Sequence, residues 1–235
     1  MTMRGAWDEH ADEWIRWVRT PGHDSYDRFH RARFLELLPP PGRLTVDLGG
    51  GEGRLGRDLT ALGHRVVMFD GSPALARACA AHERPVPVGV ADVATAPVRT
   101  GCADLVVAFM SLQDVDDLDD AVAEIARLLV PGGRLCMAIV HPMNSAGSFE
   151  EDENGSESPF VVRASYMSAF CYHDDIERDG LRMTFHSAHR PLGTYARALE
   201  RSGLVIESLR EVTDPSEGSH WQRIPLFLHL RARMA

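Results

Sequence analysis

Short apolar runs alternate with amphipathic segments along the first 140 residues of the chain. The apolar runs have the length of buried strands, and the segments between them have the spacing of helices that cover a sheet. This alternation is typical of a parallel sheet with helices on both faces. Five strands are expected, at Leu44–Leu48, Arg65–Phe69, Val86–Val90, Asp104–Phe109 and Arg134–Val140.

Helices are expected before and between these strands. The aromatic-rich segment 6–38 has a helical pattern with a break at Pro21-Gly22. The run Pro131-Gly132-Gly133 marks a helix stop followed by a turn, directly before the fifth strand. The helices of the sheet region are expected at Arg54–Leu62, Pro73–His82 and Leu118–Val130.

The regular alternation stops after residue 140. Residues 141–190 are rich in glycine, serine, acidic residues and histidine, and only Val161–Ser165 and Arg182–His186 have the pattern of short strands. A connection of this length is unusual in a compact domain unless it is functional. We therefore interpret residues 141–190 as an insertion on the ligand side, in which the acidic stretch Glu150–Glu157 is solvated.

The chain ends with one helix and two strands. The helix is expected at Leu192–Ser202 and the strands at Leu204–Val212 and Ile224–Arg231. Only polar turn residues join these strands, and parallel neighbours would need a longer crossover, so the pair is expected to be antiparallel. The whole pattern predicts an α/β, Rossmann-like three-layer sandwich with a mostly parallel seven-stranded sheet and an antiparallel C-terminal strand.

Composition narrows the class of protein. The 235-residue chain has a formal net charge of -9, so it lacks the overall positive field that collects nucleic acid or anionic lipid. No apolar run reaches the roughly 18 to 20 residues of a membrane span, and the first residues lack the pattern of a secretion signal. The four cysteines are scattered, as is common for reduced thiols. We expect a cytoplasmic protein that binds a small molecule and has no nucleic-acid or membrane partner. A homodimer is one of the oligomeric states that we consider.

The most informative segment is a glycine-rich turn after the first strand, Thr45-Val46-Asp47-Leu48-Gly49-Gly50-Gly51-Glu52-Gly53. Glycines let a backbone approach a ligand closely, and free amide groups at the start of a helix point outward toward it. Two alignments compete here. The run Gly51–Gly56 fits the dinucleotide pattern G-x-G-x-x-G but leaves Asp47 without a role. The frame Asp-x-Gly-x-Gly-x-Gly uses Asp47 and three of the glycines together.

The second alignment continues through the later strands. Asp70 ends the second strand in Phe69-Asp70-Gly71-Ser72-Pro73, and Asp92 follows the third strand in Ala91-Asp92-Val93. The fourth strand ends in Phe109-Met110, and the next helix leads into Pro131-Gly132-Gly133. Over residues 44–140 the chain resembles the class I S-adenosylmethionine-dependent methyltransferases, whose first motif has this acidic residue and glycine spacing.

The resemblance implies S-adenosyl-L-methionine as the cofactor. Asp47 would hold its methionine end, Asp70 its ribose, and Asp92 with Val93 its adenine, while Phe109 and Met110 either pack against the cofactor or belong to the core. The cofactor-contacting set implied in this way is Asp47, Gly49, Gly50, Gly51, Gly53, Asp70, Gly71, Ser72, Asp92, Val93, Phe109 and Met110.

The same resemblance organises the chain as one methyltransferase domain, 1–235. It would consist of a helical cap (1–42), a cofactor-binding core (43–140), a mobile substrate lid (141–190), and a C-terminal helix and β-hairpin (191–235).

No signature identifies the group that removes a proton from the acceptor. Histidine suits this task near neutral pH. His141 is the best placed, because it directly follows the fifth strand and ligands of open parallel sheets bind beyond the carboxyl ends of the strands. A structural histidine, hydrogen-bonded at the strand exit, is the alternative interpretation of His141.

Four further residues are expected to contact the acceptor, and each could instead serve the scaffold. They are Tyr26 in the cap and Tyr166, Phe170 and His186 in the insertion. No metal is expected, because neither the segment 171–175 nor the pair His186 and His189 belongs to a complete set of metal-ligand spacings.

Together these features predict transfer of a methyl group from S-adenosylmethionine to an O, N or C nucleophile of a small molecule. The alternatives are an enzyme with the same fold and cofactor pocket that catalyses no methyl transfer, such as a cyclase or isomerase, an NAD-dependent oxidoreductase that uses the other glycine alignment, and a cofactor-binding module without enzymatic activity.

Overall fold

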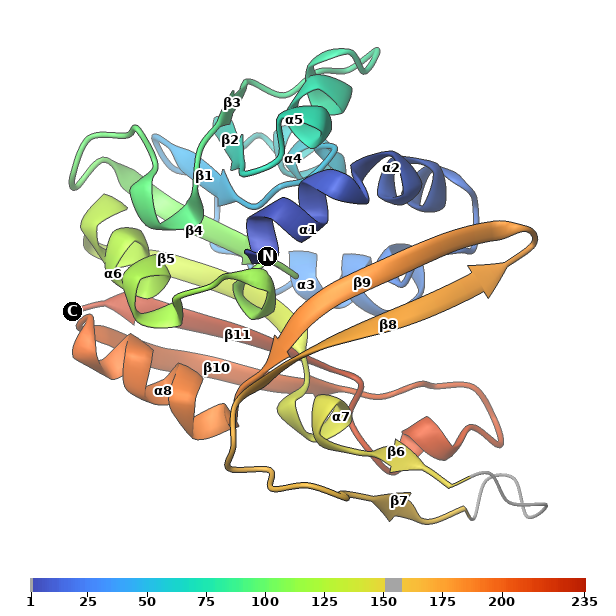
Figure 1. Cartoon of the computed structure of the whole chain (residues 1–235). Helices are drawn as coiled ribbons and strands as arrows, with labels where there is room; N and C mark the ends of the chain where they lie inside the picture. The colour runs from blue at the N-terminus through green and yellow to red at the C-terminus, as the bar shows by residue number, and fades with distance from the viewer. Residues whose placement is uncertain (1, 151–157) are drawn as a thin grey trace.

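The central sheet has seven strands in the order β10-β11-β5-β4-β1-β2-β3 (Figure 1). The computed structural model describes residues 2–150 and 158–235. Only β11 runs antiparallel to its neighbours β5 and β10, which confirms the predicted mostly parallel sheet with an antiparallel C-terminal strand. The strands are β1 (Thr45–Leu48), β2 (Val66–Asp70), β3 (Val88–Val90), β4 (Ala103–Phe109), β5 (Leu129–Val140), β10 (Leu204–Val212) and β11 (Phe227–Met234).

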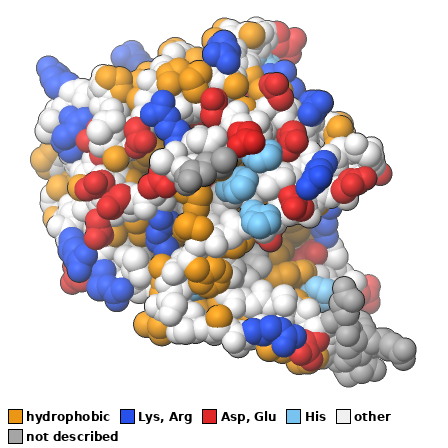
Figure 2. All heavy atoms as spheres, in the orientation of Figure 1, with side chains coloured by type: hydrophobic (Ala, Val, Ile, Leu, Met, Phe, Trp, Pro, Cys, Tyr) orange, Lys and Arg blue, Asp and Glu red, His pale blue; other side chains and the backbone are white. Residues whose placement is uncertain are grey.

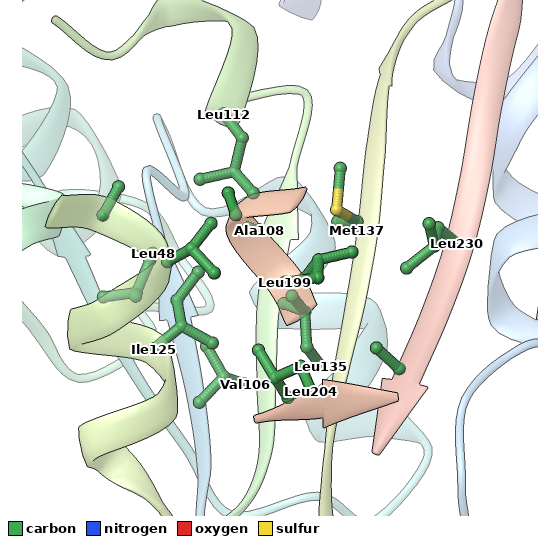
Figure 3. Close-up of a cluster of buried hydrophobic side chains, with 14 of the residues drawn as sticks. Leu48, Val106, Ala108, Leu112, Ile125, Leu135, Met137, Leu199, Leu204 and Leu230 are labelled. Carbon is green, nitrogen blue, oxygen red and sulfur yellow. The ribbon is translucent and has the colours of Figure 1, made fainter. Parts of the chain in front are cut away.

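Helices cover both faces of this sheet, as expected for parallel strands that are apolar on both sides. On one face α6 (Leu118–Leu128) and α8 (Leu192–Arg201) pack onto a cluster that includes Leu48, Val106 and Leu135 (Figure 3). On the other face a second cluster joins the sheet to α3 (Arg31–Leu35), α4 (Arg54–Ala61) and α5 (Pro73–Ala80).

The junction between α6 and β5 differs from the expected one. The helix ends at Leu128 and the strand begins at Leu129, so the Pro131-Gly132-Gly133 run lies within the first half of β5 instead of in a separate turn. The pairing of β4 with β5 shifts between Ala103 and Leu105, and this irregularity accommodates the run.

The cap is helical, as predicted, but it is broken into short pieces. These are α1 (Met3–Glu9), α2 (Ala11–Arg19), the π-helix η1 (Tyr26–His30) and α3. The break between α2 and η1 contains Pro21-Gly22, and Gly22 has a φ of 79°.

The insertion is more regular than the sequence pattern predicts. It contains α7 (Pro142–Ala146), a small pair β6 (Ser148–Phe149) and β7 (Phe160–Val161), and a long hairpin of β8 (Phe170–Arg178) and β9 (Leu181–His189). The expectation of only short strands is therefore wrong, and residues 162–165 are not a strand. Residues 151–157 of the acidic stretch lie outside the described residues.

The hairpin turn has a local cause. Asp179 and Gly180 both have positive φ, 51° and 75°, which is the geometry of the two-residue turns that match the twist of a hairpin. Figure 1 shows the hairpin crossing in front of the sheet and ending beside α2. The proposed mobility of this lid stays a prediction. Within the described part of the chain, no helix is long and apolar enough to cross a membrane.

Two buried histidines join the cap to the last strand. His30 Nδ1 lies 2.9 Å from His229 Nε2, and the two residues are 1% and 0% exposed. Burial, followed by the charge of Arg33, lowers the pKa of His229 to about 4, and burial also lowers the pKa of His30. The other ring nitrogen of each histidine has no hydrogen-bond partner among the described residues, so a second proton would be buried without compensation.

We expect the free energy of unfolding to fall as the pH drops below about 6.5. The histidine has a lower pKa in the folded protein than in the unfolded chain, so between these two pKa values the unfolded chain binds more protons. The contribution of the histidine to the free energy of unfolding is therefore fully present above the unfolded pKa and is lost as the pH falls toward the folded pKa. One such group changes the free energy by about 1.4 kcal/mol per pH unit. Urea unfolding at several pH values should show a shallower pH dependence for His229→Gln than for the natural chain. The variant His173→Gln, which removes an exposed imidazole, is the control, and equal slopes in all three proteins would contradict the prediction.

Candidate functional site

A cavity of about 1230 Å³ lies at the carboxyl ends of the parallel strands, where ligands of open α/β sheets bind. Its walls come from the strand ends, the cap, the insertion and the loop before β11. Figure 2 shows the surface hollowed below a group of histidine side chains, with hydrophobic side chains inside the hollow. The volume exceeds the roughly 300 to 1,000 Å³ of a pocket for one drug-sized ligand, so there is room for two small molecules.

The glycine turn after β1 forms the floor of this cavity. Gly49, Gly50 and Gly51 line it. A side chain at Gly49 would place its Cβ 2.5 Å from Ser111 Cβ, and Gly49 also has a φ of 71°, so only glycine fits there. Gly53 does not line the cavity. It begins α4, and a Cβ there would meet Cys79 Sγ at 2.5 Å, so its role in this structure is close packing.

Asp47, at the end of β1, lines the cavity without any hydrogen-bond partner. It is 0% exposed, and neither of its carboxylate oxygens is bonded within the described residues. Burial, and then the nearby charge of Asp70, raise the pKa of Asp47 to about 7. An unpaired buried carboxylate is costly, so this wall is suited to a ligand that brings a positive charge or hydrogen-bond donors.

Asp70, at the end of β2, fixes the shape of the glycine turn. Its two oxygens accept hydrogen bonds from Gly51 N and Ser72 N, each at 2.8 Å. Burial raises the pKa of Asp70, while these two amide groups lower it. Each oxygen keeps a second lone pair, so the carboxylate can still accept hydrogen bonds from a ligand such as a diol.

Helix α1 is fastened over the loop that follows β2. Arg4 Nε donates to Gly71 O at 2.9 Å, and Ser72 Oγ donates to Asp8 Oδ1 at 2.5 Å. Gly71 and Ser72 both line the cavity, so the cap and the Asp70 loop form one continuous wall.

The third and fourth strands bring the remaining expected residues to the same cavity. Asp92 and Val93 line it, and Asp92 also begins the 3-10 helix η2 (Val93–Thr95) by accepting a hydrogen bond from Ala94 N at 2.9 Å. Phe109 and Met110 line it as well, and Met110 has a φ of 52°, which is uncommon for a side chain of this size. The structure thus gathers all of the expected cofactor set except Gly53 around one space.

His141 does not line the cavity, which corrects its expected position. Its Nδ1 accepts a hydrogen bond from Met143 N at 3.0 Å and thereby begins α7, while its Nε2 faces the exposed Glu211 carboxylate at 3.1 Å. Burial lowers the pKa of His141, and the charge of Glu211 acts in the opposite direction. This geometry favours the alternative interpretation, a structural histidine at the strand exit.

Of the four residues expected to contact the acceptor, only Phe170 lines the cavity. Tyr26 is buried behind the wall and donates to Asp58 Oδ2 at 2.8 Å. Tyr166 accepts a hydrogen bond from Leu192 N at 3.0 Å and is absent from the lining. The ring of His186 stacks on His10 with a centroid distance of 5.1 Å, and it does not line the cavity either.

One wall of the cavity, formed by β8, was not predicted from the sequence. Alternate residues of β8 face inward, and they are Phe170, Tyr172, Asp174, Ile176 and Arg178. The alternation is hidden because polar and apolar residues occur on both sides of the strand. The Asp179-Gly180 dipeptide was the available signal, since such a pair between two strand-like runs predicts a hairpin.

A polar network faces the cavity beneath this wall. Asp114, the last residue of the 3-10 helix η3 (Leu112–Asp114), accepts a hydrogen bond from Ser187 Oγ at 2.7 Å. Tyr172 lies directly opposite Ser187 in the hairpin. Burial raises the pKa of Asp114 well above its ordinary range, and burial together with the charge of Asp114 raises the pKa of Tyr172. Asp114 and Tyr172 both line the cavity, so both polar groups can contact a bound molecule.

An aromatic group closes the cavity opposite the glycine turn. Phe185 of β9 packs edge-on against Trp7, Trp14 and Trp17, with centroid distances from 5.9 to 6.4 Å. All four rings line the cavity. Trp14 Nε1 lies 3.5 Å from the position that a Cβ of Gly51 would occupy, so cap and glycine turn approach each other closely. No group of three metal-ligating side chains that could hold an ion occurs among residues 2–150 and 158–235.

Comparison with known proteins gives matches to the core and to the whole fold. Residues 46–137 match the family described as methyltransferase domain. The ubiquinone/menaquinone biosynthesis C-methyltransferase of Acidiphilium cryptum is 34% identical over 115 residues, 46% of each chain. The demethylmenaquinone methyltransferase of Corynebacterium kroppenstedtii is 33% identical over 118 residues, 50% of each chain. The chain thus spans about half the length of the curated relatives it matches.

The fold likeness extends over most of the chain. The structure of an S-adenosylmethionine-dependent methyltransferase from Mesorhizobium loti aligns with 86% of this chain and 96% of its own length, with a TM-score of 0.69 and 24% identity. Residues 46–137 are therefore similar to the methyltransferase domain family, and the chain that contains them has the fold seen in the S-adenosylmethionine-dependent methyltransferase of Mesorhizobium loti.

Proposed function

We propose that this protein binds S-adenosylmethionine in the cavity and transfers its methyl group to a small molecule. The observation that carries the proposal is Asp47, a fully buried carboxylate that faces the cavity beside the glycine turn and has no partner in the described ranges. The methionine end of the cofactor carries an ammonium group that would satisfy this carboxylate. The names of the two curated relatives support the same reaction type, because one is a ubiquinone/menaquinone biosynthesis C-methyltransferase and the other a demethylmenaquinone methyltransferase.

The other cofactor contacts follow from the strand ends. Asp70 would accept hydrogen bonds from the ribose hydroxyls, and Asp92 with Val93 would face the adenine. Phe109 and Met110 would pack against the cofactor between the sheet and the acceptor. When bound, S-adenosylmethionine supplies a methyl group on a sulfonium, which a nucleophile displaces. The task of the chain is then to hold the nucleophile in line and to receive its proton.

Asp114 is the residue that best fits the second task. It is a carboxylate that faces the cavity, burial raises its pKa well above the ordinary range, and Ser187 fixes one of its oxygens. A raised pKa makes the ionised carboxylate a stronger proton acceptor. His141 does not face the cavity, since it is not among the residues that line it.

Two measurements test the proposed function as a whole. Calorimetry should show binding of S-adenosylhomocysteine and no binding of NADH. Incubation with S-adenosylmethionine and a library of small metabolites should release S-adenosylhomocysteine together with a product that is one methyl group heavier. Consumption of an acceptor without S-adenosylhomocysteine release would favour the cyclase or isomerase alternative.

Replacing Asp70 by Ala should weaken S-adenosylhomocysteine binding by tenfold or more. Charge-assisted hydrogen bonds to the ribose contribute on the order of 1.5 to 3 kcal/mol each, and about 1.4 kcal/mol corresponds to a factor of ten. The measurement is calorimetry on the folded variant, with thermal unfolding as the check on folding. Unchanged affinity would remove Asp70 from the cofactor site.

Gly51→Val should abolish cofactor binding, whereas Asp92→Ala should weaken it only moderately. Valine at a φ of 61° is strained, and its side chain would enter the space between backbone and ligand. Gly101→Val is a matched control, because Gly101 has nearly the same φ, 62°, with nothing within 4 Å of its added Cβ and no part in the cavity. If both valine variants bound S-adenosylhomocysteine equally well, the glycine turn would not be the cofactor floor.

Asp114→Asn should slow methyl transfer by roughly 10² or more, with S-adenosylhomocysteine affinity nearly intact. In the natural enzyme the rate should fall as the pH drops through the raised pKa of Asp114, because the protonated carboxyl cannot accept a proton. His141→Ala should instead lower the melting temperature, since it removes a helix cap of about 1 kcal/mol, and leave the rate per folded molecule unchanged. A slowed rate in His141→Ala together with an unchanged rate in Asp114→Asn would instead identify His141 as the base.

A further inference from the structure

Two carboxylates that line the cavity have no hydrogen bond or ion pair within the described ranges. Asp47 belongs to the sheet wall and is fully buried, whereas Asp174 belongs to β8 on the hairpin wall and is exposed. The other acidic side chains of the described lining are engaged. For example, Arg54 pairs with Asp24, and Arg163 pairs with Glu150. Under the proposed function Asp47 faces the cofactor, which leaves Asp174 without an assigned partner.

Asp174 is a charged group on an aromatic part of the hairpin wall. It follows Tyr172 on the inward side of β8 and lies directly opposite Phe185 of β9. Phe185 in turn packs against Trp7, Trp14 and Trp17. A carboxylate beside aromatic rings attracts a cation in two ways, through its own charge and through the negative faces of the rings.

The charges of the whole lining oppose a negatively charged acceptor. Acidic side chains outnumber arginines there, and the three lining arginines are already engaged. Arg54 binds Asp24, Arg4 donates to Gly71 O, and Arg178 donates to the backbone oxygens of Gly22 and His23. Among the described residues that line the cavity, no arginine is therefore free to bind an anionic acceptor, and the charge of Asp174 would repel such an acceptor.

The end of the cavity away from the glycine turn is apolar and aromatic. Phe149 and Trp221 meet edge-on with a centroid distance of 4.9 Å, and both line the cavity together with Phe227 and Phe170. Rings arranged in this way contact flat apolar molecules over a large area.

We propose that the acceptor is a flat, apolar molecule that carries a positively charged amine, and that Asp174 binds this amine. The proposal rests on the proposed function, because it assigns Asp47 to the cofactor and the remaining space to the acceptor. Asp174 is a specificity-determining residue in this arrangement, and the aromatic group of the cap forms the other side of the amine site. The methylated atom would lie nearer to Asp114, under Tyr172.

The test uses the full chain saturated with S-adenosylhomocysteine and matched probes. Each probe set has one aromatic skeleton of one, two or three rings and a short side chain that ends in an amine, a methyl group or a carboxylate. Calorimetry measures the affinity of each probe. We expect amines of at least one skeleton to bind about tenfold or more tightly than the matching carboxylates, as a direct charge-assisted contact requires.

Asp174→Asn should lower amine affinity by about tenfold and leave the uncharged probes unaffected. Asp175→Asn is the matched control, because the neighbouring carboxylate does not line the cavity and is held by Thr184 and Arg182. This control should bind all probes as the natural chain does.

Three outcomes would overturn the proposal. These are carboxylates that bind as tightly as amines, the absence of amine binding in every set, and a loss of S-adenosylhomocysteine affinity in Asp174→Asn as large as the loss of amine affinity. The last outcome would assign Asp174 to the cofactor. Failure of the natural chain to bind S-adenosylhomocysteine at all is a separate result, which contradicts the proposed function and not the charge of the hairpin wall.

Discussion

The hydrogen bonds of the Asp70 carboxylate are the constraint on which the site depends. They join Gly51 N of the turn after β1 to Ser72 N of the loop after β2, two segments that the parallel pairing of β1 and β2 brings together. Asp70 and Asp47 are both buried at a cost: burial raises the pKa of each, and the charge of Asp70 raises the pKa of Asp47 further. The amide groups of Gly51 and Ser72 offset part of this cost for Asp70. The carboxylate of Asp47 has no such partner within the described residues, and for this reason we propose this corner of the fold as the cofactor site.

The core and the cofactor side of the site could be predicted because their signals are local. The residues of β1 are all buried, and the apolar Val46 and Leu48 flank Asp47 directly before the glycines. Three successive glycines directly after such a strand are typical of a turn that a ligand approaches closely. Acidic residues at the ends of β2 and β3 are found by the same reasoning, since parallel strands end at one edge of the sheet. Boundaries are harder to predict where a strand contains an irregularity, as at the Pro131-Gly132-Gly133 run, which lies in β5 at the shift in its pairing with β4.

The acceptor side could not be predicted, because its residues meet through contacts between distant parts of the chain. Asp114 and Ser187 are 73 positions apart, and nothing near Asp114 in the sequence indicates that a hairpin will bury it.

For His141, the position in the fold was predicted but the direction of the side chain was not. Its place after β5 was correct, but the position of a residue at a strand end does not determine the direction of its side chain. In this chain the ring turns toward Met143 N and caps α7, because Pro142 starts that helix immediately.

The two sides of the cavity also differ in how they are held. The cofactor side consists of strand ends whose positions the sheet determines, whereas the acceptor side depends on a two-stranded hairpin, and isolated hairpins are marginally stable. The hairpin gains its support from the cap. Trp7 donates to His186 O, Arg178 donates to the backbone at Gly22, and Phe185 packs among the cap tryptophans. Helix α1 is in turn fastened to the Asp70 loop through Arg4. Movement of the hairpin away from the cap would therefore break contacts with the same segment that is fastened to the Asp70 loop.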